Sequence, residues 1–541
     1  MRVLGINSVF HDPAAALVID GVVAAAAEEE RFSRRKHGKR PVPFSAWEQP
    51  AQAARWCLRQ AGLTPEDIDL VGFSYDPALT RPAADMGLDD PWDYLRTMYA
   101  AHAPDFLASE LPGLDPARAR FVRHHVAHAA SAGLASGRTE CSVLVCDGRG
   151  ERDSCLAGRY SGGQLKVLAT QPLPHSLGLL YEELTAHLGF LRSSDEYKVM
   201  ALASYGRPRF LDQIRAKVRP VPGGFRTGPV DWPRLAPARP PDGELTGAHA
   251  DLAASVQRRL EEVLLALAGE LHAQTGDRVL AMAGGTALNC VANTVLHERG
   301  PFDEVWVQPA AGDAGTALGA ALQLAADDGE PPWSMADAGL GRGFTDAEIE
   351  AALRTARVPF ERPPDLAGAV ASVLAEDGIV AWFQGRSEFG PRALGHRSLL
   401  AHPGRRANLD RLNEVKGREK FRPVAPMVLA GRAAGIFSRG PLPSPYMLFV
   451  HDVAGHWRDR IPAVVHVDGT ARVQTVDPGE QPLTAALLTS FEQRTGLPVL
   501  VNTSLNTAGR PMADDIKDAL ECFGSTPVDA LAIGPFLVRR Q

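Results

Sequence analysis

The sequence lacks three features that would each point to a distinct class of protein. Its 541 residues include only six cysteines, and no two of them stand in a CxxC pair. A disulfide scaffold or a thiolate zinc site is therefore not expected, and a reducing compartment fits this usage. Positive charge is not in excess, because 57 Lys and Arg face 64 Asp and Glu, for a net charge of −7. No apolar run approaches the ~20 residues of a membrane span.

These absences exclude several functions. A protein that coats DNA or RNA needs a basic footprint, and an anionic membrane surface selects for one too. Near the N-terminus, His11, Asp12 and Asp20 interrupt every apolar stretch, so no secretory signal is expected. The hydrophobic content of 45% is ordinary for a globular chain. We therefore expect a soluble cytoplasmic enzyme with no nucleic-acid and no membrane partner.

The first half of the chain shows the same local plan twice. Strands are predicted at residues 2–6, 14–19 and 22–27, with the dipeptide Asp20-Gly21 as a hairpin turn. A second strand, turn and returning strand are predicted within residues 142–157. A strand, a polar loop and a hairpin open the actin-like ATPase fold, so the repetition predicts an α/β double lobe of that kind.

A Gly-, Pro- and Asp-rich stretch at residues 327–343 marks the predicted domain boundary. We expect one domain over residues 1–340 and a second α/β domain over residues 345–541. In the second domain the pattern predicts helices and strands in alternation: helices at 346–357 and 365–376, and strands at 359–362 and 379–383.

Two histidines and two aspartates predict a metal site. His124 and His128 are four residues apart, so on a helix they share one face. Asp147 ends an apolar strand, and Asp313 follows another strand in a small-residue loop. Two imidazoles and two carboxylates suit Fe²⁺, Mn²⁺ or Zn²⁺, with open positions for phosphate oxygens. The histidine spacing alone is also typical of exposed or capping histidines.

Several ordered motifs together resemble one family, the carbamoyltransferases of nodulation and antibiotic biosynthesis, whose members include O-carbamoyltransferases of the nebramycin, cephamycin and novobiocin type. The resemblance covers nearly the whole chain. The motifs are His124-His125-Val126-Ala127-His128, Cys146-Asp147-Gly148, Gly284-Gly285-Thr286-Ala287-Leu288-Asn289, Gly390-Pro391-Arg392-Ala393-Leu394-Gly395 and Val467-Asp468-Gly469-Thr470.

The resemblance implies a fold, a reaction and a set of cofactors. The first domain would be like the tRNA threonylcarbamoyl transferase, and the second like the enzyme that makes threonylcarbamoyl-adenylate. The second domain would form carbamoyl-adenylate from carbamoyl phosphate and ATP, with release of pyrophosphate and phosphate. The first would pass the carbamoyl group to a hydroxyl of a small natural product, as in antibiotic tailoring. Fe²⁺ is implied at His124, His128, Asp147 and Asp313, with Mg²⁺ accompanying ATP, and a homodimer is left open.

Cations concentrate in the second domain despite the net negative charge. Guanidinium and ammonium groups hold phosphates and stabilise charge on a displaced one, although a solvated surface would also be basic. The resemblance aligns Arg392, Lys416, Arg422 and Arg472 with substrate-binding or catalytic cations. Arg397 lies in the same run of cations, and we predict that it binds substrate too. Asn502, Thr503 and Ser504 follow a strand and match a family motif, although they could also cap a helix.

His11 stands in the loop after the first strand, beside Asp12. A neutral imidazole can take the proton of an alcohol near pH 7, and the resemblance places this histidine in the transfer site. We therefore predict a general base, with a histidine that only orders the loop as the alternative. For the nucleotide of the first domain we predict Gly284, Gly285, Asn289 and Lys198. The glycines could instead form a packing turn, and the lysine could extend to solvent.

Three other functions use part of the same pattern. Hydrogenase-maturation carbamoylation is discounted, because its proteins carry Cys-rich zinc modules. A tRNA threonylcarbamoyl-type modification enzyme is disfavoured by the net charge of −7. An actin-like ATPase without transfer would explain the hairpins but not the cations of the second domain.

Overall fold

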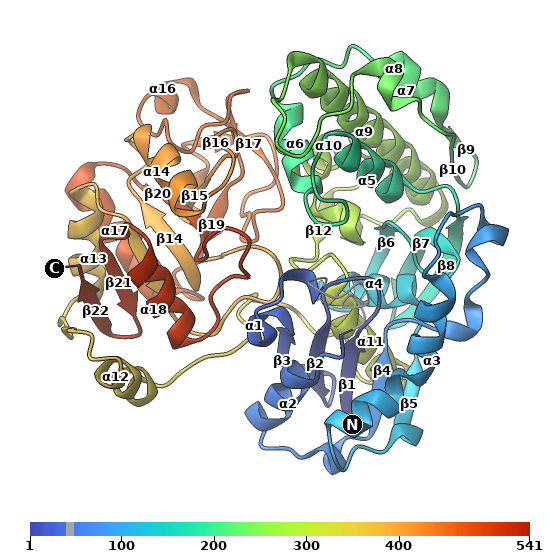
Figure 1. Cartoon of the computed structure of the whole chain (residues 1–541), viewed down its shortest axis with the longest axis horizontal. Helices are drawn as coiled ribbons and strands as arrows, with labels where there is room; N and C mark the ends of the chain where they lie inside the picture. The colour runs from blue at the N-terminus through green and yellow to red at the C-terminus, as the bar shows by residue number, and fades with distance from the viewer. Residues whose placement is uncertain (39–47, 541) are drawn as a thin grey trace. The chain divides into compact units, whose positions relative to one another are not determined.

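The computed structural model describes residues 1–38 and 48–540. The chain divides into two compact units, Met1–Met335 and Ala336–Gln541. Both units are mixed α/β structures built on central sheets (Figure 1). Among the described residues, no helix is both long and apolar enough to cross a membrane.

The first sheet of unit 1 has the strand order β3-β2-β1-β4-β5. Its first three strands form an antiparallel meander, and β4 and β5 run parallel to β1. The predicted turn at Asp20-Gly21 is confirmed, because Ile19 pairs with Val22 and both turn residues have positive φ. The strands are β1 (Arg2–Asn7), β2 (Ala14–Ile19), β3 (Val22–Glu28), β4 (Leu70–Phe73) and β5 (Ala119–Phe121).

The second sheet of unit 1 repeats this plan with the order β8-β7-β6-β11-β12. Again three strands form an antiparallel meander, and two more run parallel to the first of them. This duplicated order is the actin-like ATPase plan, and it confirms the predicted double lobe. The strands are β6 (Glu140–Cys146), β7 (Asp153–Ser161), β8 (Gln164–Pro172), β11 (Val279–Ala283) and β12 (Glu304–Val307).

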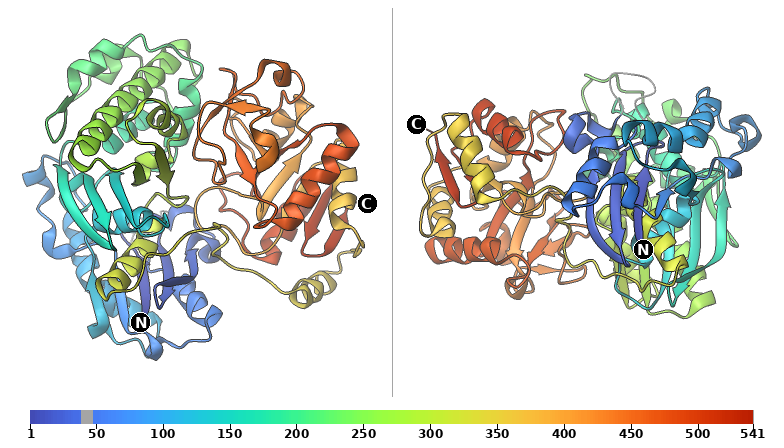
Figure 2. Two further views of the ribbon diagram at one scale, coloured as in Figure 1. Left: turned by 180° about the vertical axis from the view of Figure 1, so that it is seen from behind. Right: turned by 90° about the horizontal axis from the view of Figure 1, so that it is seen from below.

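Two helices that carry the candidate ligands pack closely in unit 1. Helix α11 (Ala314–Asp327) lies against α4 (His124–Gly133) and strand β1 (Figure 2). The approach depends on small residues, because a Cβ at Gly319 would lie only 1.7 Å from the carbonyl oxygen of Ala127. The alanine- and glycine-rich sequence of α11 therefore brings its first turn next to α4.

The other elements of unit 1 surround these sheets. The long helix α9 packs against α6 and α10 and contacts strands of the second sheet. The remaining elements are α1 (Glu30–Ser33), α2 (Ala51–Gln60), α3 (Asp93–Glu110), α5 (Leu177–His187), α6 (Glu196–Ala203), α7 (Leu211–Lys217), β9 (Val218–Val221), β10 (Gly224–Thr227), α8 (Trp232–Leu235), α9 (Gly247–Thr275) and α10 (Cys290–Arg299).

Unit 2 is organised around a seven-stranded mixed sheet of order β19-β15-β20-β14-β13-β21-β22. A small sheet of order β16-β17-β18 lies beside it in the fold. The large sheet comprises β13 (Val380–Phe383), β14 (Arg397–Ala401), β15 (Ala425–Leu429), β19 (Gln474–Val476), β20 (Val499–Ser504), β21 (Ala530–Ile533) and β22 (Phe536–Arg539). The small one comprises β16 (Phe437–Ser438), β17 (His451–Val453) and β18 (Thr470–Ala471).

Helices α13 and α17 pack against each other in unit 2, and α18 contacts β13 and β21. The strand predicted at 359–362 is wrong, because only a single bridge joins Glu361 to Leu537. Pro363 and Pro364 follow directly and have no N–H to extend a ladder. The helices are α12 (Asp346–Thr355), α13 (Leu366–Ala375), α14 (Ala407–Val415), α15 (Ala430–Ala433), α16 (Gly455–Arg458), α17 (Pro482–Thr495) and α18 (Ile516–Ser525).

Candidate metal centre and transfer site

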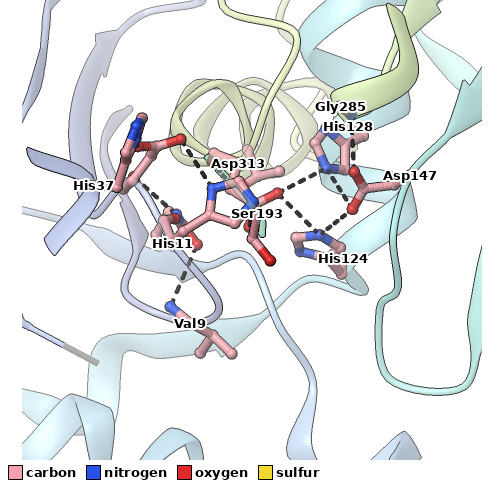
Figure 3. Close-up of polar contacts among 12 residues, drawn as sticks. Val9, His11, His37, His124, His128, Asp147, Ser193, Gly285 and Asp313 are labelled. Atoms are coloured by element: carbon pink, nitrogen blue, oxygen red, sulfur yellow. Dashed lines mark hydrogen bonds and ion pairs between the residues drawn. The ribbon is translucent and has the colours of Figure 1, made fainter. Parts of the chain in front are cut away.

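Four buried side chains of unit 1 converge as candidate metal ligands (Figure 3). His124 and His128 project from α4, while Asp147 follows β6 and Asp313 precedes α11. The His124 Nε2 atom lies 3.5 Å from Asp147 Oδ2 and 3.7 Å from Asp313 Oδ1. His128 Nε2 lies 3.7 and 3.5 Å from the same two oxygens. One ligand atom of each residue lies within 4.8 Å of the others, so a single ion can reach all four.

Several of these ligand atoms are buried without a hydrogen-bond partner. They are His124 Nε2, His128 Nε2 and Asp313 Oδ1. Buried polar atoms are normally paired, and a cluster of such atoms pointing at one spot fits a divalent ion. The residues present therefore fit the metal that their sequence pattern predicts.

Neighbouring groups orient the ligands. His124 Nδ1 donates to the carbonyl of Ser74 at 3.1 Å, which leaves Nε2 to face the cluster. Asp147 Oδ1 accepts the backbone N–H of Gly285 at 2.8 Å, which leaves Oδ2 toward the histidines. The backbone N–H of His124 donates to Glu151 Oε1 at 2.7 Å and fixes the start of α4.

The electrostatics of the cluster are those of a site built for a cation. Burial alone would lower the pKa of His124, but Asp147 and Asp313 raise it to about 9. Burial opposes ionisation of Asp147, yet His124 and His128 hold its pKa well below the usual range. The Asp147 carboxylate is thus negative, and the His124 imidazole holds a proton where an ion would otherwise sit.

His11 lies at the edge of this cluster. Its Nε2 atom is 3.7 Å from Asp313 Oδ2, on the opposite carboxylate oxygen from the one that faces the two histidines (Figure 3). Its Nδ1 atom is 2.9 Å from Asp12 Oδ2. The loop is held by Asn7, whose Nδ2 donates to the carbonyls of His11 and Asp12. An imidazole beside the metal cluster suits the predicted base, and that role stays a prediction.

Of the predicted nucleotide residues of unit 1, Gly284 and Gly285 lie next to the metal cluster, whereas Asn289 and Lys198 contact other residues. Gly284 has φ 90°, and a Cβ there would lie 2.2 Å from the carbonyl oxygen of Cys146, directly before Asp147. Asn289 Oδ1 accepts the N–H of Ala292 at the start of α10, and its Nδ2 donates to Gln257. Lys198 pairs with Asp195 at 3.1 Å. Contact of these residues with a nucleotide stays a prediction.

In unit 2, Lys416 is buried against the end of β20. Its ammonium donates to the carbonyl and the hydroxyl of Ser504, at 2.6 and 2.9 Å, and to Asn506. Asn502 is buried too, and its Nδ2 donates to Ala393 O at 3.1 Å and to Gln474 Oε1 at 2.7 Å. Asn502 therefore holds the backbone beside Arg392. Thr503 pairs with Leu399 in the sheet.

The predicted arginines of unit 2 differ in burial. Arg392, Arg422 and Arg472 are partly exposed, and Arg422 lies 3.6 Å from Glu419. Arg397 is completely buried, lies over the ring of Phe383, and donates to four backbone carbonyls, including Gln384 O at 2.9 Å. Arg397 thus supports the loops of the unit, and substrate contact by any of the four stays a prediction.

Two models of one known protein family match this chain. The model of the carbamoyltransferase N-terminus matches residues 2–227 and 234–322, and that of the carbamoyltransferase C-terminus matches residues 371–540. This chain belongs to the carbamoyltransferase family. It is an enzyme family whose name implies a carbamoyl donor and an acceptor.

Relatives of this carbamoyltransferase extend over its whole length. An uncharacterized protein of Synechocystis sp. is 38% identical over 608 residues, which cover 100% of this chain and 97% of that protein. Nodulation protein NolNO of Sinorhizobium fredii is 37% identical over 561 residues, or 99% and 80% of the two chains. Among solved structures, HypF of T. kodakarensis is 16% identical with a TM-score of 0.34, and the match covers 60% of this chain and 48% of HypF.

Sequence reasoning missed one residue beside the candidate metal centre. His37 Nδ1 lies 2.6 Å from Asp12 Oδ1, on the far side of Asp12 from His11. The two histidines are far apart in the chain, so no spacing pattern joins them. The only available signal was that the loop after β1 and the segment after β3 must meet, since the ends of β1 and β3 lie at the same edge of an antiparallel meander.

Proposed function

We propose that this carbamoyltransferase works in two steps, one in each unit. Unit 2 forms carbamoyl-adenylate, and unit 1 transfers the carbamoyl group to a hydroxyl of a small natural product. The observation that carries the proposal is the buried cluster of His124, His128, Asp147 and Asp313 with His11 at its edge. Such a cluster can hold an ion and a phosphate-bearing intermediate next to a base.

The first step balances with one water. Hydrolysis of carbamoyl phosphate gives carbamate and phosphate, and a carbamate oxygen then attacks the α-phosphorus of ATP. Pyrophosphate leaves, and carbamoyl-adenylate remains. Buried Lys416 and the partly exposed Arg392, Arg422 and Arg472 are the cations we assign to this chemistry, since each step displaces a phosphate group. Mg²⁺ accompanies the ATP.

In the second step the acceptor hydroxyl attacks the carbamoyl carbon. We assign the removal of its proton to His11 Nε2, and AMP is the leaving group. The His124, His128, Asp147 and Asp313 cluster would hold Fe²⁺, which when bound would neutralise the phosphate oxygens of the adenylate. We assign Gly284, Gly285, Asn289 and Lys198 to the side of the cluster where the nucleotide would lie.

The test of the first step separates three enzymes. The protein is incubated with ATP, Mg²⁺ and carbamoyl phosphate, and pyrophosphate and ADP are measured. We expect pyrophosphate release that depends on carbamoyl phosphate. Release of ADP would instead indicate an actin-like ATPase, and pyrophosphate release that requires threonine would indicate threonylcarbamoyl chemistry.

The acceptor is found by mass gain. Aminoglycosides, macrolides, β-lactams and simple sugars are incubated with the complete mixture, and each is inspected for the addition of one carbamoyl group. A gain on one class defines the acceptor. Pyrophosphate release without a gain on any hydroxyl compound would contradict the proposed antibiotic tailoring while leaving the adenylation step intact.

A further inference from the structure

The segment after β3 contributes a second imidazole to the transfer site. Asp12 receives two histidines, one on each carboxylate oxygen: His11 Nδ1 on Oδ2 at 2.9 Å and His37 Nδ1 on Oδ1 at 2.6 Å. Figure 3 shows His37, His11 and Asp313 following one another toward the metal cluster. The order in space is therefore His37, Asp12, His11, Asp313.

The donor and acceptor roles in this chain follow from the chemistry of a carboxylate. An ionised carboxylate only accepts hydrogen bonds, so the Nδ1 atoms of both histidines must carry protons. Burial works against the charge of Asp12, but His37 and His11 hold its pKa well below the usual range. With Nδ1 of His11 protonated, its neutral ring has the lone pair on Nε2, which faces Asp313.

The backbone around these residues is set by the surrounding structure. Asp12 has φ 51° and His37 has φ 59°, in the left-handed region, where Asp and His are more frequent than most residues other than glycine. The two residues are joined directly, because the N–H of Asp12 donates to the carbonyl of His37 at 3.4 Å. The N–H of His37 in turn donates to the buried Glu30 at 3.0 Å. These backbone hydrogen bonds thus fix both imidazoles on one carboxylate.

A second metal site would be the other use of these residues, since Asp12, Glu30 and His37 lie close enough to hold an ion. Their hydrogen bonds favour the arrangement in which two imidazoles donate to Asp12. Both oxygens of Asp12 accept from histidines, and Glu30 accepts from Arg31 on one oxygen and from the His37 backbone on the other.

We propose that His37 is a positioning residue of the transfer step, which locks the Asp12 carboxylate so that it holds His11 with Nε2 toward the metal cluster. This inference rests on the proposed role of His11 as the base. His37 touches no reacting atom. It acts through Asp12, as an orienting group acts through the aspartate of a catalytic triad.

Two substitutions at position 37 test the proposal, and neither requires a different backbone conformation there. His37→Asn keeps an N–H donor near the Nδ1 position, and His37→Gly removes it, while both residues tolerate positive φ. Pyrophosphate release by unit 2 should be the same in both variants and in wild type. The kcat of transfer to the hydroxyl found by mass gain should fall about 10- to 100-fold in His37→Gly. It should stay close to wild type in His37→Asn, with the KM for the acceptor unchanged in both.

A second measurement needs no acceptor. Histidine labelled with ¹⁵N, in the full chain with Zn²⁺ added, reports which ring nitrogen of His11 carries the proton, and His11→Asn identifies its signal. We expect protonated Nδ1 and bare Nε2 in wild type and in His37→Asn. His37→Gly should show a mixture of both tautomers.

The outcomes separate the inference from the proposed function. Equal transfer by His37→Gly and wild type would overturn the inference, as would an equal loss in both variants. If wild type binds a second equivalent of metal and the variants do not, the inference is overturned in favour of a second metal site at Asp12, Glu30 and His37. If wild type makes no carbamoyl-adenylate, the proposed function fails, and the tautomer of His11 alone decides whether His37 positions it.

Discussion

At the metal centre, one imidazole must change its charge when an ion arrives. Asp147 and Asp313 raise the pKa of His124 to about 9, against the effect of burial, so the metal-free chain carries a proton there at pH 7. A metal binds the neutral ring, and the proton must leave. The buried atoms around it that lack a hydrogen-bond partner also indicate an ion, because an ion would supply that partner.

Proton release on metal binding follows from that shifted pKa. Titration of the metal-free protein with Zn²⁺ near pH 7 should release about one proton from His124, and apparent affinity should rise about tenfold per pH unit up to about pH 9. Calorimetry in two buffers with different ionisation enthalpies measures the proton. An affinity that stays flat over this range, with no proton released, would show that His124 is neutral before the metal binds.

The individual residues of the site were predictable to different degrees. The sequence predicts the four metal ligands, because helix geometry places His124 and His128 on one face and strand geometry places the two aspartates at strand ends. Asp12 and His37 do not, since their contact depends on how β1, β2 and β3 fold together. Arg397 was expected at a substrate, yet it lies completely buried on backbone carbonyls. A guanidinium that serves the fold and one that serves a phosphate look alike in a sequence.

At the scale of elements, the contact between α4 and α11 sets the distance between the histidine and aspartate ligands. Three of the four ligands lie on these two helices or at their ends, and Gly319 lets them approach. The sequence predicts the strands and the small-residue helix well, because period-two alternation and the Asp20-Gly21 turn are local signals. It fails at 359–362, where the residues before two prolines form only one bridge, at Glu361.

Replacing Gly319 with alanine should separate these ligands. The new Cβ would lie 1.7 Å from the Ala127 carbonyl oxygen, so α11 must move away from α4. We expect a loss of about 1–3 kcal/mol in the free energy of unfolding, together with weaker metal binding. Urea denaturation and metal content measure the two effects.

The control for that substitution is Gly269→Ala on helix α9, where no atom lies within 4 Å of the new Cβ. Alanine there should stabilise the protein by about 0.5–1 kcal/mol, because glycine is the poorer helix former. Metal content should not change. If Gly319→Ala behaves like this control, the close packing of α4 and α11 does not set the ligand geometry.

At the scale of the whole molecule, we propose that adenylation and transfer each take place in one compact unit. The metal cluster lies within Met1–Met335, and Lys416 with its partners lies within Ala336–Gln541. The two family models likewise match separate parts of the chain. Composition argues against a polyanion-coating protein, but the net charge of −7 does not show where the cations gather, because a sum over the chain carries no positions.

Two substitutions should therefore separate the steps. Lys416→Met should reduce carbamoyl-phosphate-dependent pyrophosphate release at least about 100-fold, as loss of a buried charge-stabilising donor does, and leave metal content intact. Asp313→Asn should reduce metal content and transfer and spare pyrophosphate release. Loss of both activities in either variant, with an unchanged thermal midpoint, would contradict the division of labour.

The most direct test of the central claim is detection of carbamoyl-adenylate itself. Wild-type protein is mixed with ATP, Mg²⁺ and carbamoyl phosphate without acceptor, and the quenched mixture is analysed by mass spectrometry. We expect carbamoyl-adenylate in the complete mixture, and none when carbamoyl phosphate is omitted or when Lys416 is replaced by methionine. ADP as the sole nucleotide product, with no carbamoyl-adenylate, would contradict it.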